Sequence, residues 1–192
     1  MKILISDSLS PRGVEVLQQA GYTADVKTKL PKEQLLEEIK NYDGIIVRSA
    51  TKVTAEVIEA GSQLKIIGRA GTGLDNVDKE AATRRGIVVM NTPGGNTITT
   101  AEHSIAMLVA MSRKIPQATA STKAGKWEKS KFMGTELYNK TLGLVGLGQI
   151  GSVVTKLAQG LSMNVIGYDP FLAPERTREM GIESVDLPEL FR

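Results

Sequence analysis

The sequence of 192 residues contains no cysteine and only one histidine, His103. Disulfides, thiolate metal sites and cysteine nucleophiles are therefore excluded, as is a zinc site built on several histidines. Aromatic residues make up only 4% of the chain, and no apolar run reaches the roughly 18 residues of a membrane span. The first apolar run is interrupted at Asp7, unlike the apolar run of a signal peptide. We expect a cytoplasmic protein.

Neither sign of charge dominates the sequence. It has 24 Lys and Arg residues against 21 Asp and Glu residues, a net charge of +3. This balance gives no indication of nucleic acid or a membrane as a partner. The hydrophobic fraction of 41% is ordinary for a globular protein. At about 100–200 residues per domain, the length allows one large domain or two small ones.

Up to residue 90, short apolar runs alternate with segments of helical periodicity. Strands are predicted at 2–6, 22–28, 44–47, 64–68 and 87–90, and helices at 11–20, 31–41, 54–60 and 77–85. Alternation of this kind predicts a parallel sheet with helices on both of its faces. The apolar runs are continuous, as strands buried on both faces require.

The alternation stops at the sequence NTPGGN, residues 91–96, which we interpret as a domain boundary. A long helix is predicted at 99–112, with Thr99 or Thr100 as its N-cap. Because it is apolar nearly all round, we expect it to be buried in a core or an interface. Further elements are predicted as a helix at 117–127, a strand at 142–145, a helix at 149–161, a strand at 164–168, a helix from 174 and a short segment at 187–191.

The clearest motif is GLGQIG at residues 146–151, a GxGxxG between a predicted strand and a predicted helix. Gly146 would allow the tight turn, Gly148 the approach of a pyrophosphate, and Gly151 close packing of helix and strand. Free N–H groups at the helix start would bind the phosphates. Asp169 ends the next strand, where a carboxylate accepts the ribose hydroxyls and repels a 2′-phosphate. The motif predicts NAD rather than NADP; the alternative is a glycine-rich turn without a nucleotide.

Two arginines, Arg48 and Arg69, each follow directly on a predicted strand. Ligands of open α/β sheets bind outside the carboxyl ends of the strands. Arginines there indicate an anionic substrate, because the guanidinium suits carboxylate and phosphate. Gly71 and Gly73 would let backbone N–H groups approach a carboxylate. Two surface arginines without a ligand are the alternative.

The single histidine gives a weaker signal. His103 lies inside the predicted apolar helix. We interpret it as a capping or interface residue in the first turn of that helix rather than as a catalytic group.

Several segments together resemble the D-2-hydroxyacid dehydrogenase family. The matching segments are SDSL (6–9), VRSATKVTA (47–55), GRAGTGLDNVD (68–78), VMNTPGGN (89–96), KWEKSKFMGTEL (126–137) and residues 141–170. The resemblance extends over essentially the whole chain. It implies a flavodoxin-like parallel-sheet substrate-binding domain, residues 1–95, followed by the first half of a Rossmann NAD-binding domain, residues 96–192. Segment 99–127 would be a dimerisation arm of a homodimer or homotetramer.

The resemblance also implies roles for individual residues. Substrate contacts would come from Arg48, Ser49, Arg69, Ala70, Gly71 and Asn96, with the backbone N–H groups of Ala70 and Gly71 offered to the substrate carboxylate. NAD contacts would come from Thr72, Gly146, Gly148, Gln149, Ile150, Gly151, Asp169 and Pro170. Lys129, near the tip of the arm, would reach the active site of a neighbouring subunit. No metal is implied.

The implied activity is NAD-linked oxidation of a 2-hydroxyacid. The segments are most similar to family members that oxidise 3-phosphoglycerate to 3-phosphohydroxypyruvate in serine biosynthesis. In the family, an arginine and a glutamate–histidine pair from the second half of the Rossmann domain carry out catalysis. His103 does not match that histidine, and the sequence ends at Arg192 after two predicted strands of that domain. We therefore expect a fragment that holds no catalytic residue and is inactive alone.

Two alternatives stay open. One is another member of the family, acting on glyoxylate, hydroxypyruvate or lactate. The other is a truncated, non-catalytic NAD-binding module.

Overall fold

The computed structural model describes residues 1–192, apart from the side chain of Pro174. The chain divides into two compact units, Met1–Gly95 and Asn96–Arg192. The elements of the first unit are β1 (Lys2–Ile5), α1 (Pro11–Gln19), β2 (Thr23–Val26), α2 (Lys32–Glu38), the 3-10 helix η1 (Ile39–Asn41), β3 (Gly44–Val47), α3 (Ala55–Ala60), β4 (Ile66–Arg69), α4 (Lys79–Arg84) and β5 (Val88–Met90).

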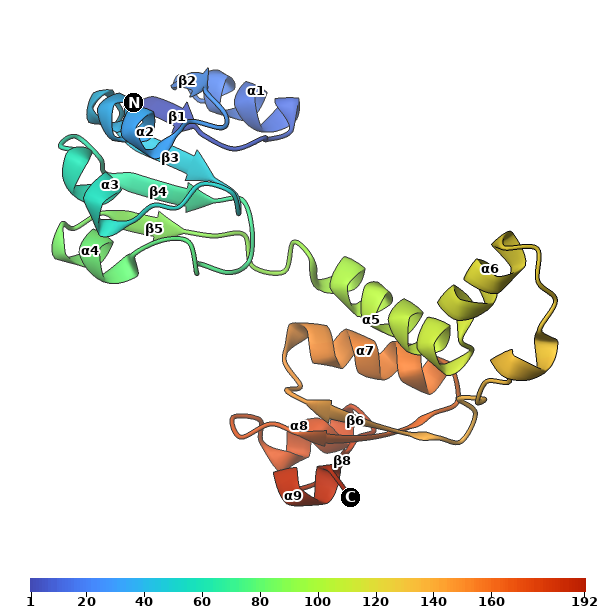
Figure 1. Cartoon of the computed structure of the whole chain (residues 1–192). Coiled ribbons are helices and arrows are strands. Elements are labelled where there is room, and N and C mark those ends of the chain that lie inside the picture. Colours follow the sequence, from blue (N-terminus) through green and yellow to red (C-terminus); the bar gives the residue numbers. More distant parts are fainter. The chain divides into compact units, whose positions relative to one another are not determined.

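The strands of the first unit form a parallel sheet in the order β2-β1-β3-β4-β5 (Figure 1). This is the strand order of flavodoxin-like folds, so the predicted fold class is confirmed. Helices α2, α3 and α4 pack next to one another on one face. Their core with the sheet includes Leu4, Tyr42, Ile45, Ile58 and Ile67, each at most 1% exposed.

The other face of this sheet is covered less completely than the sequence predicts. Helix α1 contains no buried residue. In the edge strand β5, Val89 packs against the core, whereas Val88 and Met90 are half exposed. Alternate side chains of a strand point to opposite faces. The apolar run of β5 therefore has one buried face and one open face.

The second unit contains α5 (Thr97–Ser112), α6 (Ile115–Lys123), the 3-10 helix η2 (Lys129–Phe132), β6 (Thr141–Val145), α7 (Gln149–Gly160), β7 (Asn164–Tyr168), α8 (Pro174–Glu179), β8 (Glu183–Ser184) and α9 (Leu187–Leu190). Its parallel sheet has the order β6-β7-β8 (Figure 1). That is the order of the first three strands of a Rossmann sheet. Helix α5 packs along α7.

Several sequence predictions for the second unit are wrong, including the end of the helix predicted at 117–127, which is α6 and ends at Lys123. The short strand β8 adds a third strand, because two ladder positions beside β7 were too few to give an apolar signal. Helix α5 begins at Thr97, two residues earlier than predicted, and its N-cap is Asn96 rather than Thr99 or Thr100. His103 therefore lies in the second turn of α5, not the first, and is exposed.

Helix α5 is also less buried than its apolar sequence predicts. Among the described residues of this helix only Ala101 is buried, whereas Met107 and Met111 are 56% and 71% exposed.

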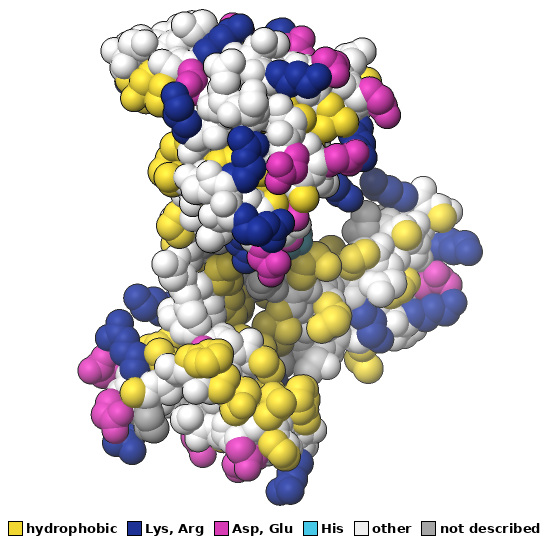
Figure 2. All heavy atoms as spheres, turned by 90° about the vertical axis from the view of Figure 1, so that its left-hand side faces the viewer, with side chains coloured by type: hydrophobic (Ala, Val, Ile, Leu, Met, Phe, Trp, Pro, Cys, Tyr) yellow, Lys and Arg dark blue, Asp and Glu magenta, His cyan; other side chains and the backbone are white. Residues whose placement is uncertain are grey.

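On the face shown in Figure 2, Lys and Arg side chains alternate with Asp and Glu side chains, and hydrophobic groups reach the surface between them. Within the described residues, no helix has the length and apolar character needed to cross a membrane.

Candidate functional site

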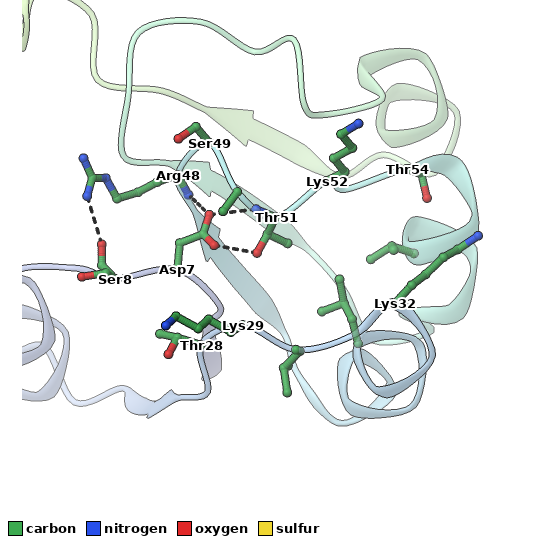
Figure 3. A pocket seen from close by; sticks show the side chains of 14 residues that line it. Asp7, Ser8, Thr28, Lys29, Lys32, Arg48, Ser49, Thr51, Lys52 and Thr54 are labelled. Atoms are coloured by element: carbon green, nitrogen blue, oxygen red, sulfur yellow. Dashed lines mark hydrogen bonds between the residues drawn. The ribbon is translucent and has the colours of Figure 1, made fainter.

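The loop of residues 48–51, which follows β3, is wrapped around the carboxylate of Asp7, which follows β1. Strands β1 and β3 are parallel neighbours, so their carboxyl ends lie side by side. The Arg48 and Thr51 N–H groups donate to Asp7 Oδ2 at 2.6 and 3.1 Å, and Thr51 Oγ1 donates to Oδ1 at 2.8 Å (Figure 3). Burial would raise the pKa of Asp7, but these donors hold it below its ordinary value. Asp7 is therefore an ionised anchor for the loop.

Asn76 holds the same loop through its carbonyl groups. Asn76 Nδ2 donates to the Arg48 oxygen at 2.8 Å and to the Thr51 oxygen at 2.6 Å. A parallel β-bridge between Val53 and Val77 joins the residues that follow the loop to the segment that follows Asn76. Both ends of the loop are thus fixed by side chains from other segments, and the residues at its tip are presented in one geometry.

Arg48 and Ser49 lie exposed on this loop, as their position after a strand predicts. The Arg48 guanidinium donates to the Ser8 carbonyl oxygen at 3.4 Å (Figure 3). A bond of this length to a neutral acceptor leaves most of the donor capacity of the guanidinium for another partner. The arrangement can bind an anion at the edge of the sheet.

Arg69 is the last residue of β4 and is held differently. Its side chain is only 12% exposed, and Nη1 lies 2.5 Å from Asp75 Oδ1. This contact lowers the pKa of Asp75. Arg69 Nε is buried without a hydrogen-bond partner among the described residues. Because Asp75 is 83% exposed, its ion pair with Arg69 is weak and can give way to an anionic ligand.

The glycines after Arg69 have a packing role that the sequence did not indicate. A Cβ atom at Gly71 would lie 3.3 Å from Arg69 Nε, and one at Gly73 would lie 3.0 Å from Arg69 Nη1. Glycine at these positions lets the loop fold over the guanidinium. The loop is fixed further by Asn91 Nδ2, which donates to the Thr72 oxygen at 2.6 Å.

The predicted use of the Ala70 and Gly71 N–H groups as carboxylate donors does not fit this structure. The Ala70 N–H donates to the Val47 oxygen at 2.9 Å, which continues the ladder between β3 and β4. The Gly71 N–H donates to the Arg69 oxygen at 2.8 Å, which closes a three-residue turn. Both groups are engaged within the chain.

The second unit carries the glycine loop between β6 and α7. Gly146 has a φ of +91°, a left-handed conformation that favours glycine. A Cβ atom at Gly151 would collide with the Gly146 carbonyl oxygen, whereas one at Gly148 would meet no atom within 4 Å. Gly148 is the N-cap of α7, and Gln149 and Ile150 begin the helix. The loop is closed at Gly151 and open at Gly148, where a phosphate could approach the first N–H groups of the helix.

Asp169 connects the end of β7 to this loop. The Leu147 N–H donates to Asp169 Oδ2 at 2.8 Å, and the Phe171 N–H donates to Oδ1 at 2.9 Å. These backbone donors lower the pKa of Asp169. A carboxylate has about four acceptor positions, so the group can accept further hydroxyl donors. Pro170 follows it on the surface, and Gln149 Oε1 accepts from Thr97 Oγ1 at 3.4 Å.

The predicted residues fall into two groups. Arg48, Ser49, Arg69, Ala70, Gly71 and Thr72 lie at the carboxyl ends of β3 and β4 in the first unit, whereas Asn96, the glycine loop, Asp169 and Pro170 lie in the second. Sequence reasoning missed Asp7 and Asn76 as parts of the site. The position of Asp7 directly after the strand predicted at 2–6 was a usable signal, since the same rule identified the two arginines. No group of potential metal ligands occurs among the residues that the structure describes.

The profile of the family described as D-isomer specific 2-hydroxyacid dehydrogenase, catalytic domain, matches residues 3–188. The chain belongs to this family. It is 52% identical over 99% of its length to the D-3-phosphoglycerate dehydrogenase of Archaeoglobus fulgidus, of which it spans 36%. The chain thus spans about a third of the length of the curated relatives it matches.

Solved structures agree with this assignment. The TT0316 protein from Thermus thermophilus matches with a TM-score of 0.88 and 32% identity, over 99% of this chain and 61% of that one. The NAD+-bound 3-phosphoglycerate dehydrogenase of Entamoeba histolytica matches with a TM-score of 0.79 and 38% identity, over 100% of this chain and 59% of that one.

Proposed function

We propose that this chain forms the substrate-binding domain and the first part of the NAD-binding domain of an enzyme that oxidises 3-phosphoglycerate to 3-phosphohydroxypyruvate. The observation that carries this proposal is the 52% identity with a D-3-phosphoglycerate dehydrogenase over both units of the chain. The anion-binding loop 48–51 and the glycine loop both lie within the matched residues.

The substrate would be held by its two anionic groups. Arg48 and Ser49 would bind the phosphate, on the loop that Asp7 and Asn76 fix. Arg69 would exchange Asp75 for the substrate carboxylate, which would also supply an acceptor for its buried Nε. In this proposal Ala70 and Gly71 shape the Arg69 loop, and Asn96 contributes a further polar contact. No residue of this chain is proposed as the acid–base group.

NAD fits the glycine loop of the second unit. Open space at Gly148 and the close approach at Gly151 together form a cradle that side chains would fill. The pyrophosphate would lie at the start of α7, and the ribose hydroxyls would donate to Asp169. Thr72, Gln149, Ile150 and Pro170 would complete the contacts. When bound, the nicotinamide supplies the acceptor for the hydride that leaves C2 of the substrate.

Replacing Asp169 is expected to change the cofactor preference. In Asp169→Ala, the Kd for NAD should rise roughly tenfold, because the ribose hydroxyls lose a charged acceptor. The Kd for NADP should rise less than that for NAD, because removing the repulsion of the 2′-phosphate offsets the loss of the Leu147 bond that holds the glycine loop. Calorimetry with both nucleotides measures the two constants, and Glu175→Ala serves as a control for loss of an exposed carboxylate. An equal change for NAD and NADP would contradict the assignment of Asp169.

Replacing Arg48 is expected to remove recognition of the phosphate. In Arg48→Gln, the Kd for 3-phosphoglycerate should rise roughly tenfold or more, whereas that for D-glycerate, which lacks the phosphate, should not change. Arg12→Gln is the matched control, since Arg12 is an exposed arginine of the same unit that pairs with Glu15. If the wild-type chain binds the two acids equally, another D-2-hydroxyacid is the substrate.

The chain is also proposed to form a homodimer or homotetramer through segment 99–127, which includes most of α5 and all of α6. Met111 and Trp127 expose 71% and 86% of their surface in this segment, and Met133 just beyond it exposes 77%. Large exposed apolar groups of this kind mark interfaces, and Lys129 lies at the start of η2. Sedimentation of the chain as a monomer at micromolar concentration would contradict this proposal.

A further inference from the structure

A cavity of about 580 Å³ lies at the carboxyl ends of β1, β2 and β3 (Figure 3). Its walls come from the segments that follow these strands, within residues 7–8, 28–35 and 48–57. In a sheet of this order, the connections leave in opposite directions between β1 and β3, and ligands bind at that switch point. The cavity therefore lies where this fold places a ligand.

Most of the cavity is not used by the proposed function. The substrate residues follow β3 and β4, and of these only Arg48 and Ser49 also line the cavity. Arg69 and its loop lie outside it. The cavity extends instead past Thr51 toward the start of α2 and α3, on the other side of the loop 48–51 (Figure 3).

The lining has an excess of positive charge. Lys29, Lys32, Arg48 and Lys52 line the cavity, and among its described lining residues the single acidic side chain is Asp7. Lys32 is already paired with Glu56 of α3, so the cations at issue are Lys29, Arg48 and Lys52. The ionised Asp7 carboxylate, which accepts from N–H and hydroxyl donors of the loop, offsets one of these charges, so the lining keeps an excess of cationic side chains. In Figure 3, Arg48 and Lys29 lie toward one end, and Lys32 and Lys52 toward the other. Such a lining favours an anion.

The surface between the two ends is apolar. Leu30 is partly buried and lines the cavity together with the core residues Leu35 and Val57, which are 4% and 1% exposed. Lysine binds phosphate as a point charge, and an apolar surface beside it adds affinity for the body of a ligand. An inorganic ion would leave this apolar surface uncovered.

We propose that the cavity is a second ligand site, for an organic phosphate monoester with an apolar body. The phosphate lies against Lys29 or Lys52, and the body lies over the partly buried Leu30, beside Leu35 and Val57. The cavity adjoins the proposed substrate site, because Arg48 and Ser49 line both, but Lys29 and Lys52 belong to the cavity and not to the proposed substrate contacts.

Three probes test the ligand chemistry: 1-naphthyl phosphate, inorganic phosphate and 1-naphthol, each titrated into the 192-residue chain by calorimetry and by amide NMR. We expect 1-naphthyl phosphate to bind roughly tenfold or more tightly than either of the others, with shifts confined to residues 7–8, 28–35 and 48–57. Equal affinity for inorganic phosphate would overturn the role of the apolar surface. Equal affinity for 1-naphthol would overturn the role of the cations, and shifts elsewhere would overturn the location.

Two variants assign the cations. Lys29→Gln and Lys52→Gln each remove one exposed charge without touching the core, and Lys79→Gln removes one from the start of α4, away from the cavity. Loss of roughly tenfold in affinity in one of the first two variants identifies the phosphate end. Unchanged affinity in both, or an equal loss in Lys79→Gln, would overturn the proposal. Thermal melting of each variant should match the wild type, which shows that binding and not folding has changed.

Discussion

A single methyl group added at Gly151 is expected to destabilise the second unit strongly. In Gly151→Ala, the new Cβ would collide with the Gly146 carbonyl oxygen, which is backbone and cannot rotate away. Either α7 must move away from the glycine loop or the loop must open. Overpacking of this kind costs about 1–3 kcal/mol, and we expect a value at the upper end because both partners are backbone.

The matched control for this variant is Gly148→Ala, which adds the same methyl group to another glycine of the same loop. At Gly148 the Cβ would meet no atom within 4 Å, and its φ of −67° suits alanine. We therefore expect Gly148→Ala to melt like the wild type and yet to bind NAD more weakly, because its methyl group occupies the space of the pyrophosphate. Denaturant unfolding followed by amide signals of each unit measures the stabilities, and calorimetry with NAD measures the binding. Equal free energies of unfolding for the two variants would show that the close approach at Gly151 does not affect stability.

The glycine loop shows which structural features a sequence pattern can predict and which it cannot. The GxGxxG spacing predicted the turn, the open position and the close approach, because each needs a residue without a Cβ. It could not predict that Leu147 donates to Asp169, since that bond depends on the register of β6 against β7. The strand β8 was missed for a related reason, because its two residues pair only through the backbone.

At the candidate site of the first unit, the sequence likewise predicted the positions of residues but not their contacts. The rule that ligands bind at the carboxyl ends of strands identified Arg48 and Arg69. The sequence could not show that Arg69 turns back onto Asp75, nor that the Ala70 and Gly71 N–H groups are already engaged. These outcomes depend on loop conformations. Asp7 is distant from Arg48 in the sequence, and only the pairing of β1 with β3 brings them together.

The carboxylate of Asp7 is expected to contribute a large part of the stability of the first unit. In Asp7→Asn, an amide nitrogen replaces one of two oxygens that accept from Arg48 and Thr51. The Arg48 and Thr51 N–H groups then donate to a neutral amide oxygen instead of a carboxylate, and hydrogen bonds to a charged group are worth about 1–1.5 kcal/mol more each than neutral ones. We expect the free energy of unfolding of this unit to fall by roughly 2–4 kcal/mol. Binding of 3-phosphoglycerate should weaken as well, since the loop that carries Arg48 loosens.

Acid should abolish the difference between this variant and the wild type. The pKa of Asp7 lies below its ordinary value of 3.8 in the folded chain, so the wild type gains stability from the ionised group above that pH. As the pH falls through the lowered folded pKa, the group takes up a proton and this contribution disappears. Unfolding in urea at pH 7 and at pH values below 3.8 measures the difference, with Glu80→Gln as a control at an exposed carboxylate of the same unit. A difference that is the same at every pH would mean that the charge of Asp7 does not hold the loop.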